Sequence, residues 1–265
     1  MENCTAGYDP PRLSSSPWVY LRLLYRLPAL ALVTFACLGY ARLTGRRKRS
    51  ARLWAILHGR ICGRTLVVSG AAPDPSAQLI VANHTTYLDA IPLAYLWPQA
   101  RPLSMHRIRS WFLLGRLSGK LGIFVDDGTS QSRRQAREDI RRAWGSGETV
   151  IVFPEGKASY GAPPSLTFRE TWRSRGEPRP TGPGPFRLGP FEEAAACAVT
   201  IQGVRIEYPG ELLAGLGGRW FEERFFWVLC QNFQISAHLF PAERASGDAA
   251  SLAQAWERRI LQRDA

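Results

Sequence analysis

Short apolar runs alternate with helical patterns along most of this 265-residue chain. Runs such as QLIVA (78–82) and VIVF (150–153) are typical of strands that are buried on both faces. Between them, SQSRRQAREDIRRAWGSG (130–147) has apolar residues at helical spacing, with Ser130 or Ser132 as the expected cap. Strands that alternate with helices predict an α/β fold in which helices sandwich a sheet.

The downstream pattern continues this alternation after one interruption. Periodicity fails between Ala158 and Pro190, where Gly, Pro and Arg predominate, and we expect a Gly/Pro-rich insertion at about 160–190. A helix (191–197), two strands (198–208 and 226–240) and a closing helix from about Gly247 to Arg263 are expected to follow.

The chain is basic, with 34 Lys and Arg residues against 22 Asp and Glu residues and a formal net charge of +12. Such an excess suits nucleic acid, an anionic membrane surface or an anionic substrate carrier, and composition does not choose among them. Neither the five cysteines nor the four histidines show metal-ligand spacing. We therefore expect no metal site and no disulfide framework.

An uncharged segment near the N-terminus predicts membrane association. LPALALVTFACLGYA (27–41) reaches about 22 Å as a helix, short of a bilayer core of roughly 30 Å. Extending it to Trp18 includes Arg22 and Arg26, which could snorkel from one helix face. A spanning helix is possible, but a helix or helical hairpin in one leaflet, broken near Pro28 or Gly39, fits the length better.

The basic cluster RRKR (46–49) follows this segment and is typical of a juxtamembrane patch on the cytoplasmic side. We therefore predict an N-terminal membrane anchor and basic patch in residues 1–50, and a catalytic domain in residues 51–265.

Two strand ends carry the polar residues of a candidate site. After the first strand, Asn83 and His84 are followed by Asp89, five residues beyond the histidine. The plainest interpretation is that Asn83, or Thr85 or Thr86, caps a helix that begins near Tyr87. A second strand ends in the same way at FPEGKAS (153–159), where Glu155 precedes a glycine that permits a tight turn.

Together, NHTTYLD (83–89), FVD (124–126) and FPEG (153–156) resemble the motifs of the glycerolipid acyltransferase family, the enzymes of the 1-acylglycerol-3-phosphate acyltransferase type. The resemblance covers roughly Arg52 to Tyr208, and the N-terminal segment is similar to the family's two-helix membrane motif. It implies transfer of a fatty acyl chain from acyl carrier protein or coenzyme A to the hydroxyl of a lysolipid, without a bound cofactor.

The resemblance also implies roles for single residues. His84 would be the general base and Asp89 the carboxylate that orients its ring, a division of labour that suits an imidazole at neutral pH. A histidine in a loop can fold back on an aspartate in the first turn of a helix. Glu155 would contact the acceptor, with a structural clamp on the turn as the alternative. The remaining substrate-binding candidates are Asn83, Phe153, Pro154, Gly156, Lys157 and Ser159.

Departures from the family motifs bear on the acceptor. Lys157 and Ala158 stand where the family commonly has Thr and a phosphate-binding Arg, and Asp127 stands where an Arg usually ends the FVD motif. FPEGKASYG is closer to the variant of the lyso-ornithine lipid acyltransferase branch. The Phe-Arg pair that follows this motif in that branch corresponds to Phe168-Arg169 or Phe186-Arg187, and both assignments stay open.

The resemblance therefore predicts a membrane-associated O-acyltransferase of lipid biosynthesis at the cytoplasmic face of a bacterial inner membrane. Its predicted partners are the acyl donor, the lysolipid and the bilayer, and no nucleic acid. The alternative is a catalytically silent membrane-binding relative that acts in a complex; a nucleic-acid binder is supported by charge alone.

Overall fold

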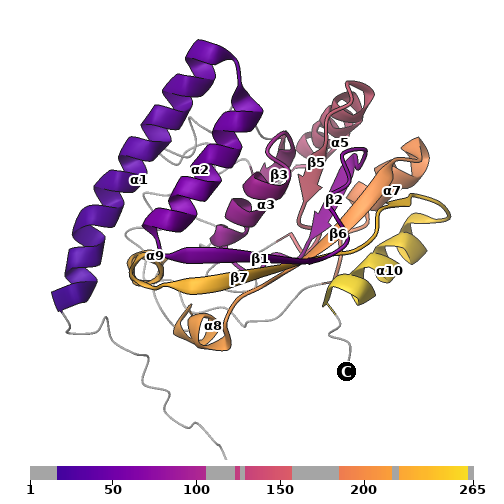
Figure 1. The fold of residues 1–265 in the computed structure, drawn as a ribbon. Coiled ribbons are helices and arrows are strands. Elements are labelled where there is room, and N and C mark those ends of the chain that lie inside the picture. The colour runs from indigo at the N-terminus through magenta and orange to yellow at the C-terminus, as the bar shows by residue number, and fades with distance from the viewer. Residues whose placement is uncertain (1–16, 106–122, 126–128, 157–184, 217–220, 262–265) are drawn as a thin grey trace, which may run out of the picture.

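The computed structural model describes residues 17–105, 123–125, 129–156, 185–216 and 221–261 (Figure 1). Within these ranges one sheet lies between helices, which confirms the predicted α/β fold. The helices are α1 (Pro17–Thr44), α2 (Arg47–Ile61), α3 (Ala90–Leu96), α5 (Ser130–Gly145), α7 (Gly189–Cys197), α8 (Gly210–Leu216), α9 (Phe221–Cys230) and α10 (Ala249–Leu261). A 3-10 turn, η1 (Tyr87–Asp89), precedes α3.

The eight strands of the described part are β1 (Arg64–Gly70), β2 (Leu79–Ala82), β3 (Arg101–Met105), β4 (Ile123–Val125), β5 (Val150–Val152), β6 (Thr200–Glu207), β7 (Phe233–Leu239) and β8 (Glu243–Arg244). Seven of them follow the order β1-β7-β6-β2-β5-β3-β4, and β8 pairs with β6. The pairs from β6 to β4 are parallel, and β7 runs antiparallel to β6. The ends of β2 and β5, where both motifs lie, are therefore at the same edge of the sheet.

Two hydrophobic cores cover the two faces of the sheet, and β2 contributes to both. Ile80 and Ala82 pack in the core that also contains residues of α3 and α9, whereas Leu79 and Val81 pack in the core formed with α5, α7 and α10. All four side chains are fully buried. Burial on both faces explains why β2 is a continuous apolar run instead of an alternating one.

Several predicted boundaries are wrong. The cap of α5 is the Thr129 side chain, which accepts a hydrogen bond from Ser132 N, and neither Ser130 nor Ser132 is the cap. The run 226–240, predicted as one strand, is helical up to Cys230 and becomes β7 only at Phe233. Aromatic and β-branched residues favour strands, but here burial against the sheet stabilises them as a helix. Most of the predicted insertion at 160–190 lies outside the described residues.

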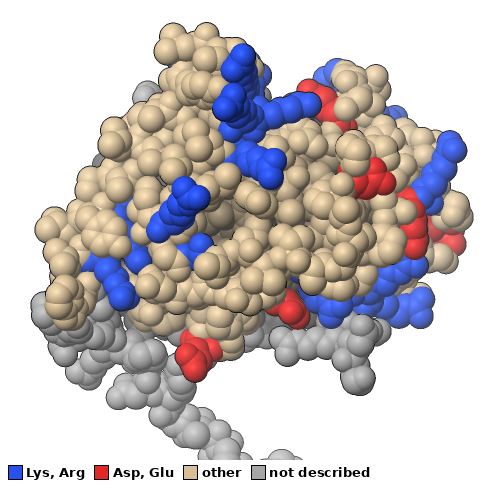
Figure 2. Space-filling model, in the orientation of Figure 1, with Lys and Arg blue, Asp and Glu red and all other residues tan. Residues whose placement is uncertain are grey.

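The N-terminal helices α1 and α2 lie side by side as a hairpin at the outside of the molecule (Figure 1). The predicted break near Pro28 or Gly39 is wrong, because α1 is continuous through both residues. The chain turns instead at Gly45, whose φ of 69° is in the left-handed region that glycine adopts readily. α2 then crosses the predicted boundary at residue 50. Lys and Arg residues gather at the tip of the hairpin, at the top of Figure 2.

Arg22 and Arg26 of α1, which could snorkel by sequence, bond to the C-terminus of α9 instead. Arg22 Nη1 donates to Cys230 O, and Arg26 donates to Leu229 O and to Asn232 Oδ1. The last carbonyls of a helix lack intrahelical partners and carry partial negative charge, so two guanidinium groups satisfy the C-terminus of α9. The first half of α1 is thereby tied to the sheet-containing part of the chain.

Gly203 is a position where a methyl group should be strongly destabilising. A Cβ there would lie 2.4 Å from the ring of Trp256, which is fully buried between β6 and α10. We expect Gly203→Ala to lower the free energy of unfolding by about 1–3 kcal/mol, measured by thermal or urea unfolding. Gly39→Ala is the control, because nothing lies within 4 Å of its Cβ position in α1. Equal stability of the two variants would contradict this packing.

Candidate active site

The first motif brings a histidine and an aspartate into contact just beyond β2. His84 Nδ1 lies 2.9 Å from Asp89 Oδ2. Asp89 is fully buried, whereas 24% of the His84 side chain is exposed. The chain between them turns through η1, so that the loop histidine folds back on the aspartate as the sequence predicts. The exposed edge of the imidazole can therefore meet a substrate while the carboxylate stays shielded from water.

The surroundings of Asp89 decide which nitrogen of His84 carries the proton. Asp89 Oδ2 also accepts hydrogen bonds from Thr85 N and Thr86 N, at 2.8 and 3.0 Å, and Oδ1 accepts one from Tyr208 Oη at 2.7 Å. A carboxylate that receives donors on both oxygens acts as an acceptor only. His84 Nδ1 must then be the donor of the remaining bond, and Nε2 of a neutral imidazole has an available lone pair.

The capping interpretation of this motif is correct for Thr86 and wrong for Asn83 and Thr85, and it is compatible with the histidine–aspartate pair. Thr86 is the N-cap of η1, with its side chain accepting from Leu88 N, and Asp89 completes a capping box. The same carboxylate therefore fixes the start of the helix and binds His84. The Asp89 carboxylate thus positions both the loop backbone and the His84 side chain, which limits the conformational freedom of both.

The second motif packs directly against the first. Glu155, which follows β5, accepts a hydrogen bond from His84 N on Oε1 at 2.7 Å and is only 5% exposed. The Phe153 ring stacks on the His84 imidazole with 4.3 Å between centroids. These contacts hold the loop of His84 from the neighbouring strand, in line with the clamp alternative for Glu155. Contact between Glu155 and an acceptor stays a prediction.

The turn after β5 is built on close contact with Arg187. Gly156 has a φ of 72°, and a Cβ there would lie 2.4 Å from the guanidinium carbon of Arg187. Arg187 N also donates to Pro154 O at 2.9 Å. The pair Phe186-Arg187 thus lies at the second motif, whereas Phe168-Arg169 is outside the described residues. The Arg187 guanidinium therefore reaches the Gly156 turn through tertiary packing, because the two residues are 31 positions apart in the chain.

Other predicted residues have different positions. The Asn83 amide bonds to Ile206 N and O of β6 and to Thr85 Oγ1, so its contacts tie the loop to the sheet. Its contact with substrate stays a prediction. Lys157, Ser159 and Asp127 lie outside the described residues. Within the described part of the chain, no three His, Cys, Asp or Glu side chains are grouped to hold a metal ion.

Tyr208 is the site residue that sequence reasoning missed. It follows β6, next to β2 in the sheet, and its buried hydroxyl reaches Asp89. Burial, and next the neighbouring Asp89, raise the pKa of Tyr208 well above its usual range, so the hydroxyl keeps its proton and donates. The available signal was its position, since it is a polar residue at a strand end like Asn83 and Glu155.

Comparison with known proteins agrees with this geometry. A family model described as Acyltransferase matches residues 66–207, a range that contains both motifs and most of the sheet. The chain belongs to the acyltransferase family. The family match includes His84, Asp89 and Glu155, and it ends just before Tyr208. Recognition of the family from its motifs is therefore confirmed.

Two individual relatives of this acyltransferase align with about half of its chain. Over 156 residues the chain is 33% identical to a lyso-ornithine lipid O-acyltransferase from Pseudomonas aeruginosa, covering 56% of this chain and 52% of that protein. Over 148 residues it is 23% identical to a 1-acyl-sn-glycerol-3-phosphate acyltransferase from Neisseria gonorrhoeae, covering 55% and 50%. The matched stretch thus spans about half the length of the curated relatives.

A solved structure shares the fold over almost the whole chain. The crystal structure of the 1-acyl-sn-glycerophosphate (LPA) acyltransferase PlsC from Thermotoga maritima aligns with a TM-score of 0.61. The alignment covers 91% of this chain and 92% of that chain at 16% identity. At this identity the similarity shows a common fold, and the chemistry of this chain has to be argued from its own residues.

Proposed function

We propose that this chain is a membrane-associated O-acyltransferase that transfers a fatty acyl group from a thioester donor to the hydroxyl of a lysolipid. The observation that supports it most is the His84–Asp89 contact, held from two neighbouring strands by Glu155 and Tyr208. A catalytically silent relative has no need of an imidazole whose tautomer is set by a buried carboxylate.

The geometry suits direct transfer. His84 Nε2 takes the proton of the acceptor hydroxyl as its oxygen attacks the carbonyl carbon of the thioester. Asp89 stabilises the resulting imidazolium through Nδ1, at 2.9 Å. As the tetrahedral intermediate collapses, the C–S bond breaks and the imidazolium returns its proton to the leaving thiolate. The new bond is an ester, and no acyl group is attached to the protein.

The class of acceptor follows from the relatives and from the second motif. The stretch of 33% identity is with a lyso-ornithine lipid acyltransferase, against 23% with a 1-acyl-sn-glycerol-3-phosphate acyltransferase. Lys157 and Ala158 replace the Thr-Arg of the common motif, which removes a bidentate partner for a phosphate. We propose a lysolipid acceptor, with lyso-ornithine lipid ahead of lysophosphatidic acid.

The experiment that tests this proposal is a transfer assay with detergent-purified protein. Acyl carrier protein and coenzyme A would each present a labelled acyl chain, and lyso-ornithine lipid, lysophosphatidic acid and other lysophospholipids would be the acceptors. We expect a diacyl product by mass spectrometry with at least one donor and acceptor. No product from any combination, with protein that still binds vesicles, would favour the silent relative.

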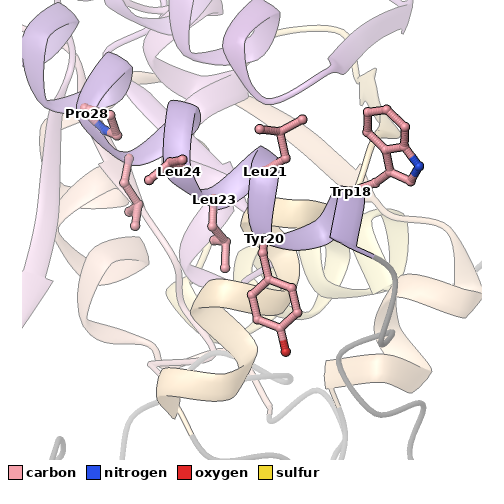
Figure 3. A pocket seen from close by; sticks show the side chains of 7 residues that line it. Trp18, Tyr20, Leu21, Leu23, Leu24 and Pro28 are labelled. Atoms are coloured by element: carbon pink, nitrogen blue, oxygen red, sulfur yellow. The ribbon is translucent and has the colours of Figure 1, made fainter.

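The α1–α2 hairpin is the proposed membrane contact. α1 includes one stretch, Tyr20–Thr44, that is long and apolar enough to cross a membrane by length and composition. The hydrogen bonds from Arg22 and Arg26 to α9, and the return of the chain through α2, favour a hairpin resting in one leaflet over a spanning helix. An apolar groove, lined by seven side chains between Trp18 and Pro28, opens on the first turns of α1 (Figure 3).

Removing apolar side chains from α1 should abolish vesicle binding without unfolding the protein. Leu24, Leu32 and Phe35 are 74%, 70% and 58% exposed, so their replacement by serine costs little core packing. We expect the triple variant to lose co-sedimentation with vesicles of phosphatidylglycerol and phosphatidylcholine, with an unchanged Tm. Leu188→Ser, an exposed site before α7, is the control. Retained binding by the triple variant would place the membrane contact elsewhere.

A further inference from the structure

A buried tyrosine separates the Asp89 carboxylate from a buried cation. Tyr208 Oη lies 2.7 Å from Asp89 Oδ1, and the tyrosine is only 6% exposed. Its hydroxyl is also within electrostatic range of Arg64, the first residue of β1. Neither Tyr208 nor Arg64 takes part in the proton transfer described above. Tyr208 follows β6 and Arg64 begins β1, and both strands lie on the same side of β2 in the sheet.

Phe233 fixes the placement of Arg64. In the β1–β7 pair, Arg64 is in register with Phe233, and its guanidinium carbon lies 5.0 Å from the centre of that ring. The Tyr208 ring packs against the same phenylalanine at 6.2 Å between centroids. Arg64 and Tyr208 are therefore both in contact with one side chain, which orders them relative to each other.

The hydrogen-bonding of Arg64 is incomplete for a buried guanidinium. Arg64 is 7% exposed, and its one hydrogen bond, from Nη2 to Val228 O, is long at 3.4 Å. Nε and Nη1 are buried and have no partner in the described part of the chain. No carboxylate of that part lies within ion-pair distance of it. Burying a cation in this way is costly unless an opposite charge compensates it.

Asp89 is the opposite charge in this region. The other groups around Arg64 and Tyr208 are Arg26 of α1, His58 of α2, Cys62 before β1 and Tyr87 of η1. Burial, and next Arg64, lower the pKa of His58 to about 3, so it is neutral at physiological pH, and burial raises the pKa of the Cys62 thiol. Of the other buried carboxylates in the described part of the chain, Glu155 is bonded to His84 N and Glu193 pairs with Arg141. Asp89 is therefore the carboxylate that shares Tyr208 with Arg64.

We propose that Tyr208 and Arg64 are positioning residues for the His84–Asp89 pair. Tyr208 holds one oxygen of the carboxylate so that the other faces His84, and the buried charge of Arg64 offsets the cost of keeping Asp89 ionised away from water. This inference rests on the proposed role of His84 as the general base. It adds a tyrosine that follows β6 and an arginine that begins β1 to a pair that the first motif supplies.

The consequence for catalysis is a tuned carboxylate. A hydrogen bond from Tyr208 and a nearby positive charge both withdraw charge from Asp89, so the carboxylate binds the imidazolium less tightly. Without them, Asp89 would bind the imidazolium more tightly, and less of the enzyme would have a free base. The acidic limb of the pH–rate profile should then move to higher pH, an effect that simple loss of packing does not produce.

Tyr208→Phe and Arg64→Met test this inference, with Tyr95→Phe and Arg101→Met as controls. Tyr95 contacts Arg52 away from the site, and Arg101 is a partly buried arginine at the start of β3 that pairs with Glu148. For Tyr208→Phe we expect kcat to fall roughly tenfold with KM within about twofold, the size of one lost hydrogen bond to a charged group. In both test variants the acidic limb of the pH–rate profile should move to higher pH, whereas in both controls it should stay at its wild-type position.

A second measurement does not depend on turnover. The proton between His84 Nδ1 and Asp89 Oδ2 should give a low-field proton NMR resonance that is absent in His84→Ala. We expect this resonance to move in Tyr208→Phe and Arg64→Met but not in the controls. If both the resonance and the acidic limb stay in place, the inference is wrong. If the wild type shows no transfer but its resonance responds, the proposed function fails and the positioning role survives.

Discussion

Replacing His84 by alanine is expected to lower kcat for acyl transfer by about 10²–10⁴-fold, the usual contribution of a general base. The imidazole is the side chain at this site that can take a proton at neutral pH, because Asp89 and Glu155 are both buried and engaged as acceptors. KM for either substrate should change little, since the methyl group of alanine leaves the backbone bond from residue 84 to Glu155 in place.

The His84 variant has to be distinguished from a misfolded protein. His84 is partly exposed and its ring contacts Phe153, so its loss removes limited packing and the Tm should fall only slightly. His238→Ala is the matched control: this histidine bonds Ser69 on the β1 side of the sheet, and transfer should stay at the wild-type rate. Substantial transfer by His84→Ala would exclude the histidine as the base.

The second large effect is expected for Asp89→Asn, which removes charge but keeps shape. The amide oxygen can take the place of Oδ2 and accept from Thr85 N, Thr86 N and His84, while the NH₂ group faces Tyr208 Oη, whose proton can rotate away. The imidazolium then loses its counter-charge in a buried site. We expect kcat to fall by about 10²–10³-fold, measured in the same transfer assay.

The fold should survive this substitution better than Asp89→Ala, which leaves donors of the buried loop without an acceptor. Asp74→Asn is the control, because Asp74 is a partly exposed turn carboxylate whose Oδ1 accepts from Ser76, and it is not a hydrogen-bond partner of His84 or Asp89. Near-normal transfer by Asp89→Asn would show that orientation of the histidine matters and charge does not. Loss of transfer together with a large drop in Tm would be a folding defect.

Much of the fold and part of the site could be predicted because local chemistry determines them. β2 is recognisable because a strand buried on both faces has to be apolar throughout, and the helix after it because Thr86 and Asp89 form a capping box. The contact between His84 and Asp89 is also local, since the two residues are five positions apart and a short loop followed by the 3-10 turn η1 brings their side chains together. Such features depend on neighbours in the chain.

Other elements could not be predicted, because distant contacts override local preference. Residues 226–230 favour a strand by composition, but they form the end of α9, whose last carbonyls are satisfied by Arg22, Arg26 and Arg64 from segments about 165 or more positions away. Arg22 and Arg26 were expected at a membrane surface for the same reason: their partners are invisible from their own segment.

The motifs alone thus identified the acyltransferase family and the histidine–aspartate pair, because those residues act through spacing that any strand–loop–helix unit preserves. Only the packed sheet decided that Glu155 bonds the backbone of His84 and that the Arg187 side chain packs against Gly156. It also decided that Tyr208 bonds Asp89 and that Arg64 packs against Phe233. The physical reason is the order of the strands. β5 and β6 are far from β2 in the chain but are its two neighbours in the sheet, so the residues that follow them meet at one buried carboxylate. β1 precedes β2 directly in the chain, but β7 and β6 lie between the two strands in the sheet.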